Sequence, residues 1–331
     1  MTDHSIISRR AFAALGCFAL AGVALSPGAM AQSYPDKPVR IIVPFSAGGG
    51  SDTAGRAIAQ KLQEKFGQSF FVENRTGAGG SIGATQAARA APDGYTLLLG
   101  SSSEIAQYPN VKTDVPYNSE RDFVPIAEVA RVPLALVVKQ DLPVKSVEEL
   151  LDYARKNPKK LNYGSAGPGS TTHLAVALFT SMTNTDMVHV PYKGSAPVIT
   201  DLLAGTLDLS ISTMPAVLPH ANGGKIKVLA VSTAQRAKAI PDVPTIQEAG
   251  VKGYETGLWT GLFAPAGTPA EIVSTLNKAV NEALATDDMK ALLAKQGAEP
   301  SGGTPEEFAK LIKQDLTIWK DVAEKNNIKI D

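Results

Sequence analysis

Residues 39–52 read VRIIVPFSAGGGSD, and this stretch decides the fold. The apolar run at 39–43 is typical of a buried strand, and the apolar spacing from Ile58 onward is typical of a helix. Between them, glycines allow a sharp turn with free backbone N–H groups, and Ser51 or Asp52 occupies the position expected for a helix N-cap. A strand, a glycine turn and a helix N-terminus together form a concavity of positive partial charge, which suits an anion.

No Lys or Arg lies in this loop, so dipoles rather than a cation would hold the anion. A polyphosphate usually requires a Lys, an Arg or a metal as well, and the loop therefore favours a carboxylate. The stretch alone also fits a tight turn that binds nothing.

Two more strands of the first half, at 70–72 and 95–99, end in small polar turns. The turn after the first is NRTGAGG at 74–80, and the turn after the second is GSSS at 100–103. Ligands of α/β proteins bind at the edge where parallel strands end. Ser102 and Ser103 are therefore candidate ligand contacts, although a plain turn explains them equally well.

The second half of the chain repeats the strand, glycine turn and helix device. A strand at 161–163 leads through GSAGPGSTTH at 164–173 into another helix. The alternation of β-rich runs with amphipathic helices predicts an α/β protein with largely parallel sheets. The proline-rich stretch at 108–133 predicts a connection between lobes, and the C-terminal helices, with no strand among them, would cover the first lobe. We predict a discontinuous first lobe at 32–130 and 259–331, and a second lobe at 131–258.

The first 31 residues are typical of an export signal. Arg9 and Arg10 precede an apolar run, and Ala29 and Ala31 are small residues at the positions that a signal peptidase recognises. The paired arginines are similar to a twin-arginine signal. We expect cleavage after Ala31 and a periplasmic mature protein.

Composition excludes several classes of function. The formal net charge is zero, so no basic surface predicts nucleic-acid binding. Cys17, the single cysteine, lies in the export signal, so we expect no disulfide and no thiolate metal site. The remaining histidines, His173, His189 and His220, have no zinc-binding spacing. We therefore predict no metal and no cofactor.

Three motifs resemble catalytic signatures but do not match them. The run GAGGSIG at 77–83 has its last glycine one place late for a dinucleotide fingerprint. The run YGSAG at 163–167 has Tyr163 in place of the first glycine of a nucleophile elbow. Gly224-Lys225 is followed by Ile226, which excludes a phosphate-binding P-loop. We do not expect an enzyme.

The chain resembles the tripartite tricarboxylate transporter receptor family, also called the Bug family of periplasmic solute-binding proteins. The family's hallmark turn is a Pro, an aromatic residue, two small residues, Gly-Gly, two residues and an Asp, which matches 44–52. The resemblance covers nearly the whole mature chain through NRTGAGG (74–80), PDGYTL (92–97), YGSAG (163–167), PYKG (191–194) and LFAPAGTP (262–269).

The resemblance implies a two-lobed periplasmic-binding-protein fold, similar to type II, that closes on a small carboxylate in a cleft between the lobes. The family pattern implies contacts from two facing turns: Phe45, Ala47, Gly48, Gly49 and Asp52 on one side, and Ser165, Ser170, Thr171, Thr172 and His173 on the other. Family members often reach the carboxylate through backbone N–H groups and ordered waters. For Asp52 a capping role stays open, and for His173 a neutral capping or packing role stays open.

The resemblance further implies an exported monomer that delivers a di- or tricarboxylate, an amino acid or an aromatic acid to the membrane subunits of a transporter. Two alternatives come from other classes. A periplasmic cofactor-dependent enzyme would show cofactor absorbance or turnover of its ligand. A ligand-presenting partner of a membrane sensor would affect a transcriptional response rather than uptake.

Overall fold

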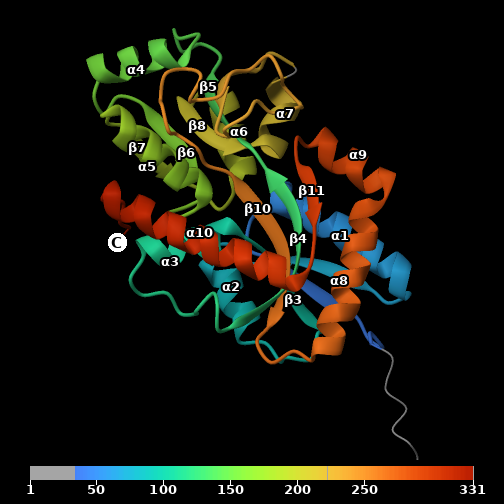
Figure 1. Cartoon of the computed structure of the whole chain (residues 1–331). Coiled ribbons are helices and arrows are strands. Elements are labelled where there is room, and N and C mark those ends of the chain that lie inside the picture. Colours follow the sequence, from blue (N-terminus) through green and yellow to red (C-terminus); the bar gives the residue numbers. More distant parts are fainter. Residues whose placement is uncertain (1–33, 222, 331) are drawn as a thin grey trace, which may run out of the picture. The chain divides into compact units, whose positions relative to one another are not determined.

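The computed structural model describes residues 34–221 and 223–330. The predicted export signal and its cleavage site lie outside these residues. The described chain after Tyr34 belongs to one compact unit, Pro35–Asp331, and contains two β-sheets with helices packed on them (Figure 1). No helix in the described ranges has both the length and the apolar character needed to cross a bilayer.

The six-stranded sheet has the order β11-β4-β10-β3-β1-β2. Its strands are β1 (Val39–Val43), β2 (Phe70–Asn74), β3 (Thr96–Ser101), β4 (Phe123–Val132), β10 (Leu258–Pro265) and β11 (Glu299–Gly302). The helices associated with it are α1 (Gly50–Phe66), η1 (Ala78–Gly80), α2 (Ser81–Ala88), the π-helix η2 (Ser103–Gln107), α3 (Tyr108–Val111), α8 (Ala270–Ala285), α9 (Asp287–Lys295) and α10 (Pro305–Lys325). We call this sheet and its helices the first lobe.

The five-stranded sheet has the order β7-β6-β8-β5-β9. Its strands are β5 (Leu134–Lys139), β6 (Asn162–Ser165), β7 (Val188–Pro191), β8 (Leu209–Thr213) and β9 (Ile226–Val231). Its helices are α4 (Val147–Lys156), α5 (Thr171–Thr183), α6 (Ser195–Leu203) and α7 (Met214–Ala221). We call this group the second lobe. The exact lobe boundaries proposed from the sequence stay a prediction.

Parallel pairing brings the functional turns to one edge of each sheet. β1 pairs in parallel with β2 and with β3, so the turns after Val43, Asn74 and Ser101 all lie at the same edge. β6 likewise pairs in parallel with β7 and β8. This part of the sequence prediction is confirmed.

Both sheets are mixed, and the prediction of largely parallel sheets is wrong. β10 runs antiparallel to β3 and β4, and β5 runs antiparallel to β8 and β9. β4 occupies much of the stretch that the sequence predicted as a connection, and β11 interrupts the predicted run of C-terminal helices. β4 ends at Val132 and β5 begins at Leu134, so the chain passes from one sheet to the other within one residue.

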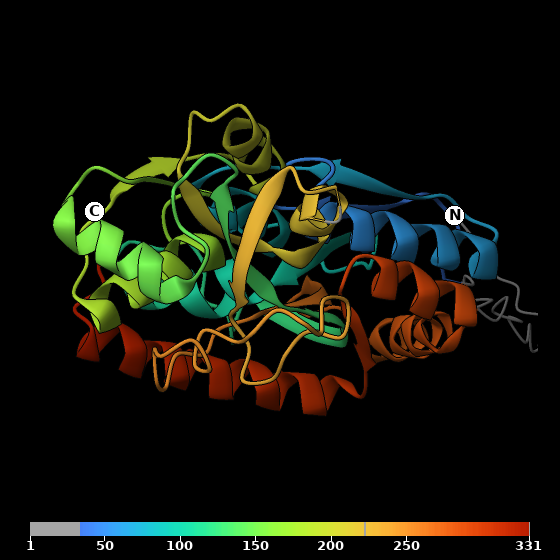
Figure 2. The same ribbon diagram turned by 90° about the horizontal axis from the view of Figure 1, so that it is seen from above.

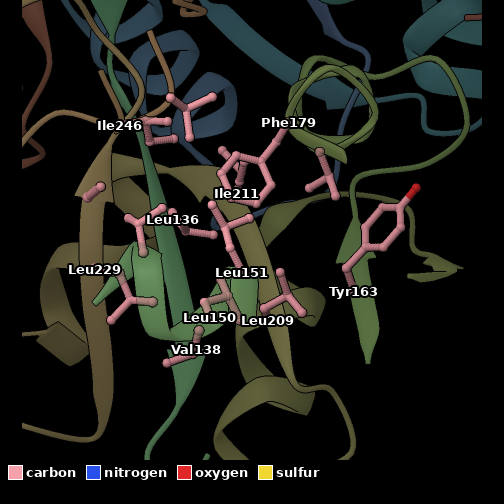
Figure 3. Packing of buried hydrophobic residues seen from close by; sticks show 14 of the residues in the cluster. Leu136, Val138, Leu150, Leu151, Tyr163, Phe179, Leu209, Ile211, Leu229 and Ile246 are labelled. Atoms are coloured by element: carbon pink, nitrogen blue, oxygen red, sulfur yellow. The ribbon is translucent and has the colours of Figure 1, made fainter. Parts of the chain in front are cut away.

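Each sheet has its own apolar core. Figure 3 shows the second-lobe core, where side chains of α4 and α5 pack on β5, β6, β8 and β9. In the first lobe, Trp259, Phe263 and Phe308 pack together, and the Trp259 and Phe308 rings meet edge to face at 5.3 Å. Full burial of a large apolar side chain contributes about 1.5–3 kcal/mol, so these cores hold the strand ends in place.

The C-terminal helix α10 touches both lobes. Its first half packs on the first-lobe core through Phe308 and Ile312, and its second half reaches α5 (Figures 1 and 2). A separate apolar cluster joins Trp319 and Ala323 of this helix to Leu174 of α5. The two lobes therefore share an apolar contact between α10 and α5.

Candidate functional site

In the turn between β1 and α1, no side chain of the N-cap residue caps the helix. Gly49 is the N-cap of α1, with φ −81° and no side-chain bond, so the expectation that Ser51 or Asp52 caps the helix is wrong. Gly48 has φ +80°, a conformation that favours glycine. Ala47 and Gly48 are exposed, Phe45 is partly buried, and Gly49 and Ser51 are buried.

Asp52 organises this turn from inside. Its carboxylate accepts the Gly48 N–H at 3.0 Å, the Asn74 side-chain amide at 2.9 Å and the Arg56 guanidinium at 3.0 Å. Burial alone would raise the pKa of Asp52, but these hydrogen bonds outweigh it and hold the pKa below its usual value. The same Asn74 amide also donates to the Phe45 carbonyl at 2.9 Å. Asn74, which sequence reasoning missed, therefore supports the turn together with Asp52.

The end of β3 supplies Ser102 and Ser103, both 1% exposed. Ser103 Oγ donates to the Gly79 carbonyl at 3.0 Å and accepts the Thr171 N–H of the second lobe at 3.3 Å. Ser102 Oγ accepts the Gln107 side-chain amide at 3.5 Å. Ser103 is thus a direct bridge between the lobes.

The second-lobe turn runs from β6 to α5 and is bonded mostly within itself. Ser170 caps α5 by accepting the His173 N–H at 3.3 Å. Thr172 Oγ1 accepts the Ala166 N–H at 2.8 Å, and Ser165 Oγ accepts the Gly167 N–H at 3.1 Å. Thr171 differs, because its buried hydroxyl has no hydrogen-bond partner in the structure.

His173 belongs to a stack of rings beneath this turn. Its ring lies 4.1 Å from that of His189, which in turn lies 4.9 Å from the ring of Tyr163. His173 Nδ1 accepts the Gly169 N–H at 3.1 Å, so the ring is neutral with its proton on Nε2. Burial, reinforced by His189, lowers the pKa of His173 to about 3. His173 therefore packs within the second-lobe turn, as the alternative from sequence proposed.

The turns of the two lobes touch along a surface that we call the junction. From the first lobe it contains turns 44–50, 77–81 and 101–103, and from the second lobe turns 165–171, 191–195 and 213–215. Ser46 donates its N–H to the Lys193 carbonyl at 3.2 Å. A Cβ atom on Gly50 would lie 3.0 Å from Pro215 Cγ, and one on Gly79 would lie 2.6 Å from the Pro168 carbonyl oxygen.

Several buried polar atoms on the junction segments have no hydrogen-bond partner. Beside Thr171 Oγ1 they are Ser46 Oγ and Thr213 Oγ1, as far as the described residues show. Gln107 Oε1, on η2 just outside the junction, is also unpaired. An unpaired buried polar group costs about 1–3 kcal/mol, so such a group on a contact surface indicates a place where a polar ligand or water binds. Sequence reasoning missed Ser46, Gln107 and Thr213. For Thr213, its position at the end of β8 beside β6 was the available signal.

Helix N-termini converge on the junction without an accompanying cation. The first residues of α1, α5, α6 and α7 lie at or next to the contacts described above. Lys193 contributes its carbonyl, and its side chain is exposed. Arg56 is bonded to Asp52 and Asn74. The chemistry of the junction is therefore that of backbone N–H groups, hydroxyls and helix dipoles, which suits an anion of low charge.

Other kinds of site are not found at the junction. In residues 34–221 and 223–330 no group of three or more His, Cys, Asp or Glu side chains could hold a metal ion. A pocket of about 340 Å³ lies between Phe123 and Ile312 of α10, and its lining includes none of the predicted site residues. At the junction the turns of the two lobes are in direct contact.

The chain matches the family model described as tripartite tricarboxylate transporter family receptor over residues 54–328. BugT of Bordetella pertussis is 37% identical, and the match covers 97% of this chain and 98% of that protein. A solved structure from R. palustris with adipate is 42% identical, with a TM-score of 0.87 over 89% of this chain and 99% of that one. MatC from Rhodopseudomonas palustris with bound malate is 34% identical, with a TM-score of 0.85 over 87% of this chain and 99% of that one.

These matches establish the two-lobed fold of periplasmic binding proteins for the chain. They span nearly the full length of both partners, so the likeness is not confined to one lobe. The roles of the predicted contacts in ligand binding stay a prediction.

Proposed function

Because the chain belongs to the tripartite tricarboxylate transporter receptor family, we propose that it captures a small carboxylate in the periplasm for membrane subunits of a transporter. Like its relatives, the chain is a solute-binding protein and not an enzyme.

The observation that carries the proposal is a junction that holds buried, unpaired polar atoms and whose one cationic residue, Lys193, is exposed. Backbone N–H groups and hydroxyls can donate hydrogen bonds to a carboxylate, and these bonds offset the cost of removing its charge from water. Adipate and malate accompany two related structures, so a dicarboxylate is the first ligand to test. Longer or aromatic acids would contact the same turns with one carboxylate end.

In this proposal the acid lies between two groups of residues. From the first lobe these are Phe45, Ala47, Gly48, Gly49, Ser51, Asp52, Ser102 and Ser103. From the second lobe they are Ser165, Ser170, Thr171, Thr172 and His173. Within each group the roles differ: Thr171 reaches the acid directly through its unpaired hydroxyl. Ser103 joins the two lobes, and Asp52, Thr172 and His173 shape the turns that present backbone N–H groups. Closure over the acid would exclude water and strengthen each dipole contact.

Binding is tested by a thermal-shift panel of dicarboxylates, tricarboxylates, amino acids and aromatic acids on the mature protein. The cognate acid should stabilise the fold by about 2.7 kcal/mol at a hundredfold excess over its dissociation constant. Gly48→Ala should weaken that stabilisation, because φ at Gly48 is +80°. Gly205→Ala is the matched control, since Gly205 has φ +79° and equally open surroundings beyond α6. Absence of any stabilising acid would overturn the proposal.

Location and delivery need separate measurements. Fractionation of cells should place the protein in the periplasm, and replacing Arg9 and Arg10 by Lys should retain it in the cytoplasm if export uses the twin-arginine route. Deleting the gene should abolish uptake of the acid that the panel identifies. Normal uptake in the deletion strain would contradict a transport role.

A further inference from the structure

Glu104 is a buried acid next to the junction that the proposed function does not use. It follows Ser103 on η2, and its side chain is 0% exposed. Its carboxylate accepts the Ser101 N–H at 2.5 Å and the Ser101 hydroxyl at 2.7 Å. Within residues 34–221 and 223–330, no Lys, Arg or His forms an ion pair with it.

The carboxylate lies directly behind the glycine turn of the first lobe. A Cβ atom on Gly80 would lie 2.9 Å from Glu104 Oε2 and 3.1 Å from the ring of Phe45. Gly79, the preceding residue, contacts Pro168 of the second lobe and accepts a hydrogen bond from Ser103. Glu104 therefore lies directly behind two first-lobe turns of the junction, the one that contains Phe45 and the one that contains Gly79 and Gly80.

Neighbouring elements supply no positive charge to balance it. Tyr117 donates its hydroxyl to the Glu104 backbone carbonyl, and Tyr108 lies on α3 immediately after η2. On α10, Asp315 accepts the Trp259 Nε1–H at 2.9 Å, and Lys310, Lys313 and Lys320 are exposed. On α5, His173 is neutral, and on η1 and α2 the neighbours are glycine and Ser81. Burial raises the pKa of Glu104 to about 7, although the bonds from Ser101 lower it.

A second negative charge at the junction would act on Glu104 with little screening. Two negative charges that share a low-dielectric site cannot both stay ionised without a large cost. Of the two carboxylates, Glu104 has the higher pKa, so it is the one that takes up a proton. Glutamate also has a local role here, because its bond to the Ser101 N–H supports the start of η2. That local role alone would require no change of protonation on ligand binding.

We propose that Glu104 takes up one proton when an organic anion binds, so that this receptor captures its acid together with a proton. The proposal rests on the proposed function, since it needs a carboxylate at the junction. The apo protein holds Glu104 partly ionised near neutral pH, and the loaded protein holds it neutral. Glu104 acts as a positioning residue through Gly80 and Ser101, without itself touching the ligand.

The consequence is a pH-dependent affinity that the ligand's own ionisation does not explain. A dicarboxylate such as adipate or malate is fully ionised above about pH 6.5, well above the ordinary range of carboxyl pKa values. Over the range in which apo Glu104 is ionised and bound Glu104 is neutral, linkage predicts up to about a tenfold weaker affinity per pH unit. Below that range the affinity should level off.

The experiment measures the dissociation constant of the best acid from the panel between about pH 6.5 and pH 9 by calorimetry. The wild type should weaken with rising pH, and Glu104→Gln should give a nearly flat profile with the higher affinity at high pH. Calorimetry in phosphate and in Tris should show uptake of about one proton near pH 8 for the wild type and none for the variant. Gln keeps an oxygen for the Ser101 N–H, and thermal unfolding of the variant verifies its fold.

Asp315→Asn is the control, because Asp315 is a partly buried acid that is bonded to Trp259 in the first-lobe core. It should keep the pH slope of the wild type. A flat wild-type profile, or equal slopes in wild type and Glu104→Gln, overturns the proton link while leaving carboxylate binding intact. If no acid binds at any pH, the proposed function itself fails and this inference falls with it.

Discussion

Ser103 Oγ lies 3.3 Å from the backbone nitrogen of Thr171, and this hydrogen bond joins the end of β3 in the first lobe to the start of α5 in the second. The same hydroxyl donates to the Gly79 carbonyl at 3.0 Å, so one side chain ties three turns together. Both partners are backbone groups at the junction. A bridge of this kind exists only while the lobes touch, and it therefore favours the closed arrangement.

Ser103→Ala should weaken ligand binding without unfolding the protein. The substitution leaves a buried N–H and a buried carbonyl without partners, which costs about 1–2 kcal/mol in the closed arrangement and predicts roughly 5- to 30-fold weaker affinity. Calorimetric titration with the cognate acid measures the change. Thr200→Ala serves as the control, since its hydroxyl bonds only within α6, to the Ala196 carbonyl at 3.2 Å. Equal affinities of wild type and Ser103→Ala would contradict the bridging role.

Gly79 limits how closely the lobes approach, and Gly79→Ala should hold them apart. A Cβ atom there would lie 2.6 Å from the Pro168 carbonyl oxygen, a backbone atom of the opposite lobe that cannot simply rotate away. Relieving such a contact costs about 1–3 kcal/mol, which predicts roughly 5- to 150-fold weaker ligand binding. Small-angle scattering with saturating ligand should show a larger radius of gyration than that of the wild type.

The matched control for this wedge is Gly67→Ala. Gly67 has φ +69° and Gly79 has φ +60°, so both variants carry similar left-handed strain, about 1–2 kcal/mol. Nothing lies within 4 Å of a Cβ at Gly67, which ends α1 away from the junction. Both variants should therefore lose similar stability, and only Gly79→Ala should lose affinity. Equal losses of affinity would show that strain, and not contact between lobes, is responsible.

Asp52→Asn should loosen the first-lobe turn. The carboxylate bonds to Gly48, Asn74 and Arg56, and an amide cannot accept all of these bonds, so the variant should lose about 1–3 kcal/mol of unfolding free energy. Because its pKa in the fold lies below the usual value, Asp52 stabilises the protein at neutral pH, and this contribution disappears as the pH falls through the folded pKa. Urea unfolding at neutral pH measures the loss.

Asp288→Asn provides the contrast for Asp52. Asp288 pairs with Lys61 at 2.5 Å, but its side chain is 63% exposed, and an exposed ion pair contributes little to stability. Its melting temperature should stay that of the wild type. A similar loss in both aspartate variants would mean that the charge alone, and not the bonded turn, accounts for the effect of Asp52.

Local patterns predicted the parts of this fold that local chemistry determines. The apolar run at 39–43 forms β1, and α1 ends at Gly67 in the left-handed conformation, as glycine at a helix end predicts. β4 escaped prediction because its sequence, FVPIAEVARV, contains Pro125, which is rare inside a strand, and does not alternate between apolar and polar residues. Its pairing with β10 depends on residues more than 120 positions away in the sequence.

For the candidate site, too, the sequence predicted the features that depend on local residues and missed those that depend on contacts between the lobes. Glycine and hydroxyl turns at strand ends were visible in the sequence, and the structure brings several of them to the junction. Which polar atoms stay unpaired there depends on contacts with the opposite lobe, so the sequence could place Thr213 at a strand end but could not show that its hydroxyl is unpaired. Asp52 is the opposite case. The motif suggested that its carboxylate contacts a ligand, but in the structure this carboxylate accepts hydrogen bonds from Arg56 and Asn74.

The histidine stack should make the second lobe sensitive to acid. Burial lowers the pKa of His189 to about 4 and that of His173 to about 3, whereas an unfolded histidine titrates near 6.5. Between about pH 6.5 and pH 4 the unfolded chain therefore binds protons that the folded chain does not, and the unfolding free energy falls as the pH falls.

Buried carboxyls act in the opposite direction, so the measurement must be a difference between proteins. Burial raises the pKa of Glu104 to about 7 and that of Asp315 to about 6, and these groups bind protons in the fold as the pH falls. In the native protein His189 Nε2 lies 2.6 Å from Ser165 Oγ, and His189→Gln keeps a hydrogen-bonding side chain at this position but removes the titration. Urea unfolding at about pH 7 and about pH 4 should show a smaller acid loss for this variant than for the wild type. His220→Gln, on α7, should follow the wild type, and parallel losses in wild type and His189→Gln would refute the role of the stack.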